Sequence, residues 1–169
     1  MRNLRLLALA AAIVASGILL GGSIYDSLVL APNMNGNLPQ SLEHGRQFMH
    51  AATPASFFRL ISPLTQITLL LAVIFCWKVR VARWWPVIGL LAALAGDGLT
   101  FAYFYPRNAL LFGEPLAQPV GVLAAAAREW AQMNWVRVAL VTLAMVSALT
   151  ALTKVAAAPE SARQQTGSE

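Results

Sequence analysis

The sequence predicts an all-α fold, a polytopic four-helix bundle in a membrane, on three observations. First, 58% of its 169 residues are hydrophobic and only 11% are charged, whereas a soluble domain has about a quarter charged residues. Second, the mean hydropathy is +0.62, which implies more apolar surface than a water-soluble fold of this length can bury. Third, four apolar runs between charged residues approach the ~20 residues that cross a hydrocarbon core of ~30 Å.

The four spans follow from the positions of the charged residues. They are expected at about residues 6–28, 60–79, 84–105 and 132–153. Together they form a single transmembrane domain over residues 1–155, followed by a small, polar and disordered tail at 156–169. The first run follows two arginines, as in a signal peptide. It is longer than the 7–15 residues of a typical signal core, which favours a retained helix.

The positions of the prolines predict where helices begin in the segments between the spans. Thr53 and Pro54 form a helix cap followed by proline at the first helical position, and Ser62 and Pro63 repeat the pattern. We therefore expect a short interfacial helix in the first outer loop, carrying Phe57 and Phe58, and then a sharp break before span two. Residues 121–135 predict an extended helix that leads directly into span four.

Basic residues set the predicted orientation, because short cytoplasmic loops are rich in lysine and arginine. Three lie in the tight connection at residues 78–83 and two precede span one. Both termini are therefore expected in the cytoplasm, in a multi-pass protein of the cytoplasmic membrane. The net charge of +5 does not predict nucleic-acid binding, because no basic stripe with interleaved aromatic residues exists. The expected partner is membrane lipid, and a homo-oligomer is compatible with the sequence.

Asp97 is the most unusual residue of the apolar runs. It lies eight residues, or ~12 Å, inside the predicted end of span three. An ionised acid at that depth costs several kcal/mol unless it is paired, hydrated or protonated. Phe101, Phe104 and Asn108 follow on the same helix face. Asp97 therefore either belongs to a functional pocket or makes a structural hydrogen bond to a serine or threonine of a neighbouring helix.

A second polar stripe is expected at the start of span four, where Trp130, Asn134 and Arg137 share one helix face. Only 16 residues without charge follow Arg137, which span ~24 Å, so the span must begin before this arginine. We expect Arg137 to share a hydrated pocket with Asp97 rather than to pair with it, because the two side chains lean apart. The alternative is an arginine that snorkels to the headgroups.

Span one offers further candidate residues near its end. Gly17 and Gly21 are four apart, which lets another helix approach closely. Tyr25 and Asp26 follow one turn later and are either interface residues or one wall of the outer pocket. The two histidines of the chain are six residues apart, which does not place two metal ligands on one helix face. Neither a metal site nor a cofactor is predicted.

Aromatic and polar residues concentrate in four motifs at the helix ends. These motifs are GGSIYDSLVLAP, PASFFRLISPLTQ, TFAYFYPRN and REWAQMNWVR. Together they resemble the anthrone-oxygenase-like family of small four-helix membrane proteins, most of which have no assigned function. The resemblance implies a bundle in which these motifs meet at one end. It also implies oxidation of flat ketones by molecular oxygen, a reaction that needs no metal in principle.

In such chemistry a base removes an acidic ring proton, the carbanion reacts with oxygen, and donors stabilise the enolate. By chemical type and helix facing, Asp97 would be the base. The enolate oxygen would be held by Arg137, Asn134 and Tyr103. The alternative function is a non-catalytic membrane protein, acting as a complex partner or a lipid-binding helper. In the catalytic hypothesis, the pocket around the substrate would also be lined by Tyr25, Asp26, Phe101, Phe104, Asn108 and Trp130.

Overall fold

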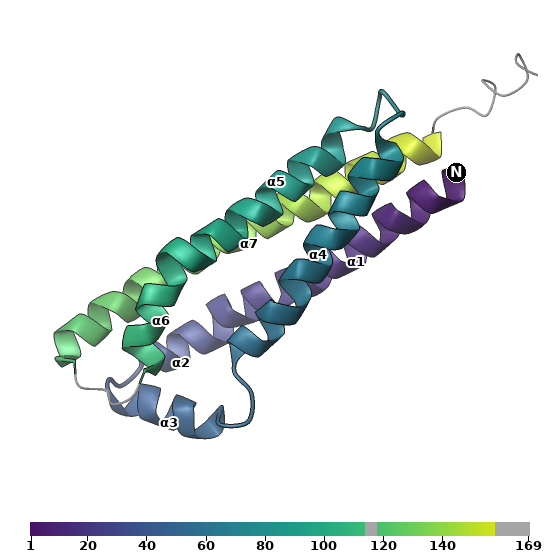
Figure 1. Cartoon of the computed structure of the whole chain (residues 1–169). Coiled ribbons are helices and arrows are strands. Elements are labelled where there is room, and N and C mark those ends of the chain that lie inside the picture. Colours follow the sequence, from purple (N-terminus) through teal and green to yellow (C-terminus); the bar gives the residue numbers. More distant parts are fainter. Residues whose placement is uncertain (114–117, 158–169) are drawn as a thin grey trace, which may run out of the picture.

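The structure, a computed structural model, describes residues 1–113 and 118–157, and they form a bundle of long helices without strands in these ranges (Figure 1). The α-helices are α1 (Arg2–Tyr25), α2 (Ala31–Asn35), α3 (Gln40–Phe48), α4 (Pro54–Cys76), α5 (Trp84–Leu99), α6 (Tyr105–Phe112) and α7 (Val120–Ala157). Two π-helical segments, η1 (Asp26–Leu30) and η2 (Thr100–Phe104), join α1 to α2 and α5 to α6.

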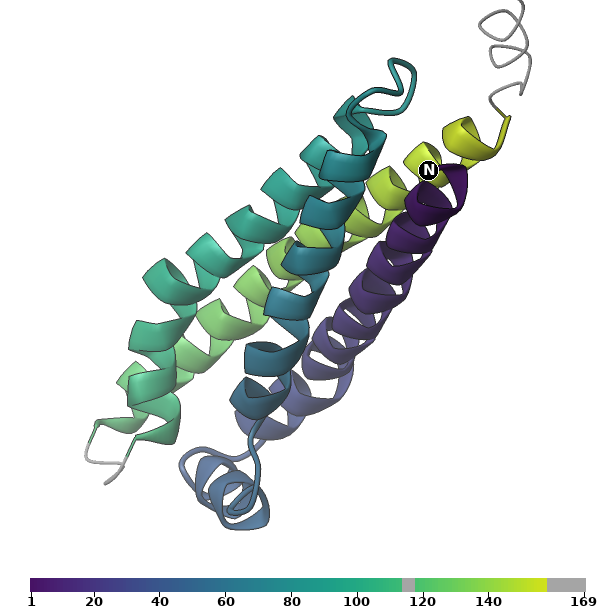
Figure 2. The ribbon, with the colours of Figure 1, turned by 45° about the vertical axis from the view of Figure 1, so that its right-hand side comes forward.

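Four continuous helical rods make up the bundle. They are Arg2–Asn35, Pro54–Cys76, Trp84–Phe112 and Val120–Ala157, and each is long and apolar enough to cross a membrane. The rods lie side by side in both ribbon views (Figures 1 and 2). This confirms the predicted four-helix bundle of a multi-pass integral membrane protein. We call the end with α2, α3 and α6 the pocket end and the opposite end, where the chain begins, the terminal end.

The helices extend beyond the predicted spans. The first rod continues to Asn35, and α7 begins at Val120 and has 38 residues, which confirms the extended helix leading into span four. Of the predicted disordered tail, residues 156 and 157 belong to α7. The remainder of that tail, residues 158–169, lies outside the described residues.

The short helix of the first connection is α3, at Gln40–Phe48. The expectation of a helix around Phe57 that ends in a break at Pro63 was wrong. α4 begins at Pro54, after the extended residue Thr53, and runs through Pro63 to Cys76. Proline removes one backbone donor, but such a loss is tolerated inside membrane bundles where neighbouring helices and hydroxyl side chains supply contacts.

Small residues set how closely the helices approach. A Cβ atom at Gly89 of α5 would lie 3.1 Å from the carbonyl oxygen of Ala144 in α7, so only glycine fits this crossing without a shift. The predicted pair in α1 behaves differently. Gly17 has Met145 as its nearest neighbour at 3.8 Å, and Gly21 faces open space. A close helix approach therefore lies at Gly89 of α5 and not at the glycine pair of α1. In α1 the close contact is at the neighbouring Gly22, where a Cβ atom would overlap the ring of Phe57 in α4.

Candidate functional site

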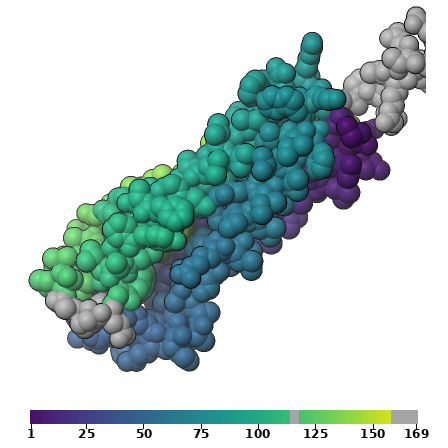
Figure 3. Space-filling view, in the orientation of Figure 1, coloured from purple at the N-terminus to yellow at the C-terminus, as the bar shows by residue number. Residues whose placement is uncertain are grey.

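A cavity of about 840 Å³ lies at the pocket end. Its walls come from α4 on one side and from α5, η2 and α6 on the other. Residues of α1, η1 and α7 form its floor, and residues of α3 and the segment after it line its outer end. Figure 3 shows the hollow between the surfaces of α4 and α6 on the side of the bundle. The cavity is thus lateral, between two membrane-spanning rods.

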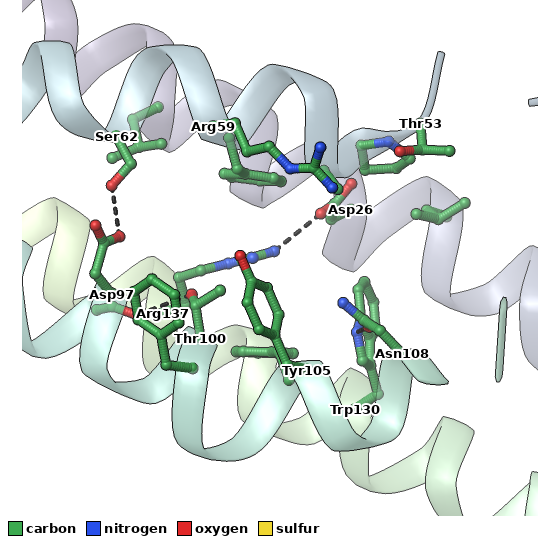
Figure 4. Close-up of a pocket in the computed structure, with 18 of the residues that line it drawn as sticks. Asp26, Thr53, Arg59, Ser62, Asp97, Thr100, Tyr105, Asn108, Trp130 and Arg137 are labelled. Carbon is green, nitrogen blue, oxygen red and sulfur yellow. Dashed lines mark hydrogen bonds and ion pairs between the residues drawn. The ribbon is translucent and has the colours of Figure 1, made fainter. Parts of the chain in front are cut away.

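Asp97 lies at the inner end of this cavity and is bonded to α4. The hydroxyl of Ser62 donates to Oδ1 at 2.5 Å (Figure 4), and Nε2 of Gln66 donates to Oδ2 at 2.5 Å. Two donors offset part of the cost of placing an acid at this depth. The structure therefore contains the serine hydrogen bond of the structural interpretation. The same carboxylate lines the cavity, as the functional interpretation requires.

Arg137 forms a buried ion pair on the cavity floor. Its Nη2 donates to Oδ2 of Asp26 at 2.9 Å, and the two side chains are 8% and 5% exposed. As expected, Arg137 does not bond to Asp97, but its actual partner was not foreseen. The guanidinium carbon lies 4.1 Å from the ring centre of Phe58 and 4.8 Å from that of Phe104. Its Nε is buried and has no hydrogen-bond partner among the described residues.

Asn134 supports the floor from below instead of facing the cavity. It is fully buried, and its Nδ2 donates to the carbonyl oxygen of Ser23 at 3.0 Å and to the hydroxyl of Ser27 at 2.6 Å. These bonds join α7 to α1 and η1, one turn from Arg137. Because Asn134 fixes the two helices that carry the ion pair, it is a positioning residue and not a surface of the pocket.

The outer wall is aromatic and is held by a further hydrogen bond. Nε1 of Trp130 donates to Oδ1 of Asn108 at 2.9 Å, which joins α7 to α6. The rings of Trp130 and Phe104 meet edge to face with their centres 5.7 Å apart. Phe101 is largely exposed and lines the cavity beside Tyr105, with their ring centres 5.1 Å apart. Aromatic faces of this kind suit a flat, apolar ligand.

Both π-helical segments lie at the cavity. η1 begins at Asp26, and η2 begins at Thr100, three residues after Asp97. A π segment holds an extra residue in its turn and is frequent at functional sites. Here η2 carries Phe101 and Phe104 to the cavity. The two irregular turns therefore coincide with the polar floor and the aromatic wall.

Of the ten predicted site residues, seven line the cavity. These are Asp26, Asp97, Phe101, Phe104, Asn108, Trp130 and Arg137. Three do not line it. Asn134 lies beneath the floor, Tyr25 is 60% exposed on the outside of the bundle, and Tyr103 packs under Arg107, whose guanidinium carbon is 3.4 Å from the ring centre.

Several lining residues were missed by reasoning from the sequence. Ser62 of α4 lines the cavity beside Asp97, and Arg59 and Thr100 also line the cavity. Gln66 holds the second oxygen of Asp97. A signal was present in the sequence, because Ser62 and Gln66 are four residues apart and therefore form a polar stripe on one face of the helix.

Within the described ranges, no group of three or more histidine, cysteine, aspartate or glutamate side chains could hold a metal ion. His50 lines the outer end of the cavity, and its Nδ1 lies 3.1 Å from the carbonyl oxygen of Gln47. His44 does not line it.

Comparison of the chain with protein-family models, with curated proteins and with solved structures finds no match. The fold and the site therefore define the class of protein by themselves. It is an integral membrane four-helix bundle with a lateral, aromatic cavity whose floor is polar.

Proposed function

We propose that the protein binds a flat, apolar small molecule with an oxygen on its ring in the lateral cavity. The observation that carries this proposal is an aromatic cavity of about 840 Å³ with a carboxylate and a guanidinium on its inner surface. This volume lies within the range of ~300–1,000 Å³ for small-molecule sites, which are mostly apolar with a few placed polar groups. Arg137 can donate to a ring oxygen, and Asp97 can accept a proton or a hydrogen bond.

We further propose that the bound compound is oxidised in an oxygenase-like reaction without a cofactor, as the resemblance to anthrone-oxygenase-like sequences implies. Asp97 removes a proton from a ring CH2 group beside the ketone, and Arg137 stabilises the enolate oxygen. The carbanion then reacts with O2, so that the CH2 group becomes a carbonyl and the second oxygen atom leaves as water. Tyr103 and Asn134 have no part in this scheme, because they do not face the cavity.

The alternative is a non-catalytic role as a complex partner or a lipid-binding helper. One observation favours it. Both oxygens of Asp97 accept hydrogen bonds from α4, an arrangement that fixes two helices whether or not any reaction takes place. In that case the cavity would hold a lipid chain or a partner's side chain, and Asp97 would contribute only to stability.

The variant Asp97→Asn distinguishes the catalytic function from the non-catalytic alternative. For the detergent-purified protein, native mass spectrometry would identify the bound molecule, and oxygen consumption would be measured in the presence of anthrone. We expect the wild type to retain an aromatic ketone or quinone and to consume oxygen, and the folded variant to lose oxygen consumption by a factor of 10² or more.

The control is Glu129→Gln, which also removes one acid but lies outside the cavity lining. It should behave as the wild type does. A wild type that carries only lipid and consumes no oxygen, with an Asp97→Asn variant of lower thermal stability, would refute the catalytic proposal and support the alternative.

We also propose that both termini face the cytoplasm. The described part of the terminal end carries six basic residues and no acidic residue, whereas the described acids lie toward the pocket end. This asymmetry agrees with the excess of lysine and arginine in short cytoplasmic loops. The basic residues are Arg2, Arg5, Lys78, Arg80, Arg83 and Lys154.

A further inference from the structure

The outer part of the cavity differs in charge from its floor. Arg59 lines the cavity one turn from Ser62 on α4. Its side chain extends along the cavity toward the side where Thr53 lies and away from Asp97 (Figure 4). Arg46 and His50 line the same outer end from the side of α3. Two arginines and a histidine are therefore gathered where the cavity approaches the end of the bundle.

The ion pair of the floor is internally compensated, whereas Arg59 has no charged partner among the described residues. Asp26 and Arg137 neutralise one another at 2.9 Å. At the inner end, the Asp97 carboxylate accepts hydrogen bonds from two neutral donors, which hold it but do not cancel its charge. Among the described residues, Arg59 has neither a salt bridge nor a hydrogen bond to its guanidinium. The cavity thus presents a positive group at its mouth that no side chain of the described chain satisfies.

We propose that the ligand of the cavity carries an anionic group, a carboxylate or a phosphate, which Arg59 binds at the mouth. This inference rests on the proposed function and narrows the class of ligand to an acidic amphiphile. The guanidinium fork matches the two oxygens of such a group. Arg59 is exposed, so the attraction is that of a charge pair near a protein surface, which is stronger than in bulk water and weaker than in the interior.

The positions of the charged residues also orient this ligand. Arg59 and Ser62 are three residues apart on α4, a rise of ~4.5 Å, and Ser62 is bonded to Asp97. An acidic group on Arg59 therefore places the body of the ligand along the aromatic wall of Phe101 and Phe104, with its far edge at Asp97. The anion and the carboxylate are kept at opposite ends of the ligand, which avoids repulsion between them.

The test compares an anthraquinone carboxylate with the matching neutral carboxamide, using quenching of tryptophan fluorescence in detergent, since Trp130 lines the cavity. We expect the wild type to bind the carboxylate at least about tenfold more tightly than the carboxamide. Arg59→Gln should abolish this preference and leave the affinity for the carboxamide unchanged, whereas Arg59→Lys should keep part of it. Arg128→Gln, an exposed arginine outside the cavity lining, is the matched control.

The outcomes separate this inference from the proposed function. Binding of both probes with equal affinity, unaffected by Arg59→Gln, would refute the anionic ligand and leave the small-molecule cavity intact. Binding of neither probe would refute both. Competition by phosphatidylglycerol, but not by phosphatidylcholine, in an Arg59-dependent manner would support the inference with a lipid headgroup as the source of the anion. Competition by neither lipid, with the carboxylate still preferred, would support it with a free acid as the source.

Discussion

Arg137 and Asp26 carry opposite charges and are both buried, so each depends on the other for compensation. Removing a charge from water costs several kcal/mol, and the attraction within the pair repays that cost only when the geometry is good. Here the 2.9 Å hydrogen bond and the rings of Phe58 and Phe104 enclose the guanidinium. The pair therefore adds little net stability as a unit, but it makes each partner indispensable to the other.

Arg137→Met should lower the free energy of unfolding by about 3–5 kcal/mol, because it leaves the Asp26 carboxylate buried and unpaired. The measurement is thermal or denaturant unfolding in detergent. The double variant Asp26→Leu with Arg137→Met should recover most of the loss. The control is Arg107→Met, whose pair with Glu129 is 24% and 49% exposed and should contribute less than about 1 kcal/mol. If Arg137→Met and Arg107→Met lowered the free energy of unfolding equally, the proposed dependence of Asp26 on Arg137 would be wrong.

At the scale of the elements, the spacing of charged residues was enough to predict four rods, because a bilayer fixes the length of any apolar helix that crosses it. It was harder to predict from the sequence which face of each helix packs against a neighbouring helix. The pairing of Arg137 with Asp26 depends on how α7 packs on η1, which no local pattern encodes. The π segments also lacked a sequence signature. The break expected at Pro63 does not occur, and a proline inside a helix is tolerated in a membrane bundle where neighbouring groups satisfy the backbone.

The crossing of α5 and α7 gives a prediction at this scale. Gly89→Leu should lower the free energy of unfolding by about 1–3 kcal/mol or more, because the new side chain would be forced against Ala144 and Leu69. Gly21→Leu is the matched control, since a Cβ atom there meets nothing within 4 Å, and it should not destabilise the protein. Unfolding in detergent measures both, and a tolerated Gly89→Leu would show that the helices can separate without cost.

For the whole molecule, the arrangement of charge matters as much as the arrangement of helices. The terminal end is basic in its described part, whereas the described acids lie toward the pocket end. The pocket end also contains the ion pair between Arg137 and Asp26 and the lateral cavity. A membrane protein inserted with its basic end in the cytoplasm would present the cavity near the opposite face of the bilayer. Its ligand would then be taken from the outer leaflet or from beyond it.

Cysteine accessibility on intact cells tests this orientation. Cys76 is the single cysteine of the chain and is buried, so Cys76→Ser provides a background without reactive thiols. In that background, Gln40→Cys marks the pocket end and Val81→Cys marks the connection between α4 and α5, where Val81 is 62% exposed. A membrane-impermeant maleimide should modify the first variant on intact cells and the second only after lysis. Neither substitution alters a basic residue, so the charges that direct insertion are kept. The reverse pattern would place the cavity on the cytoplasmic side, and its ligand would then have to be an intracellular compound.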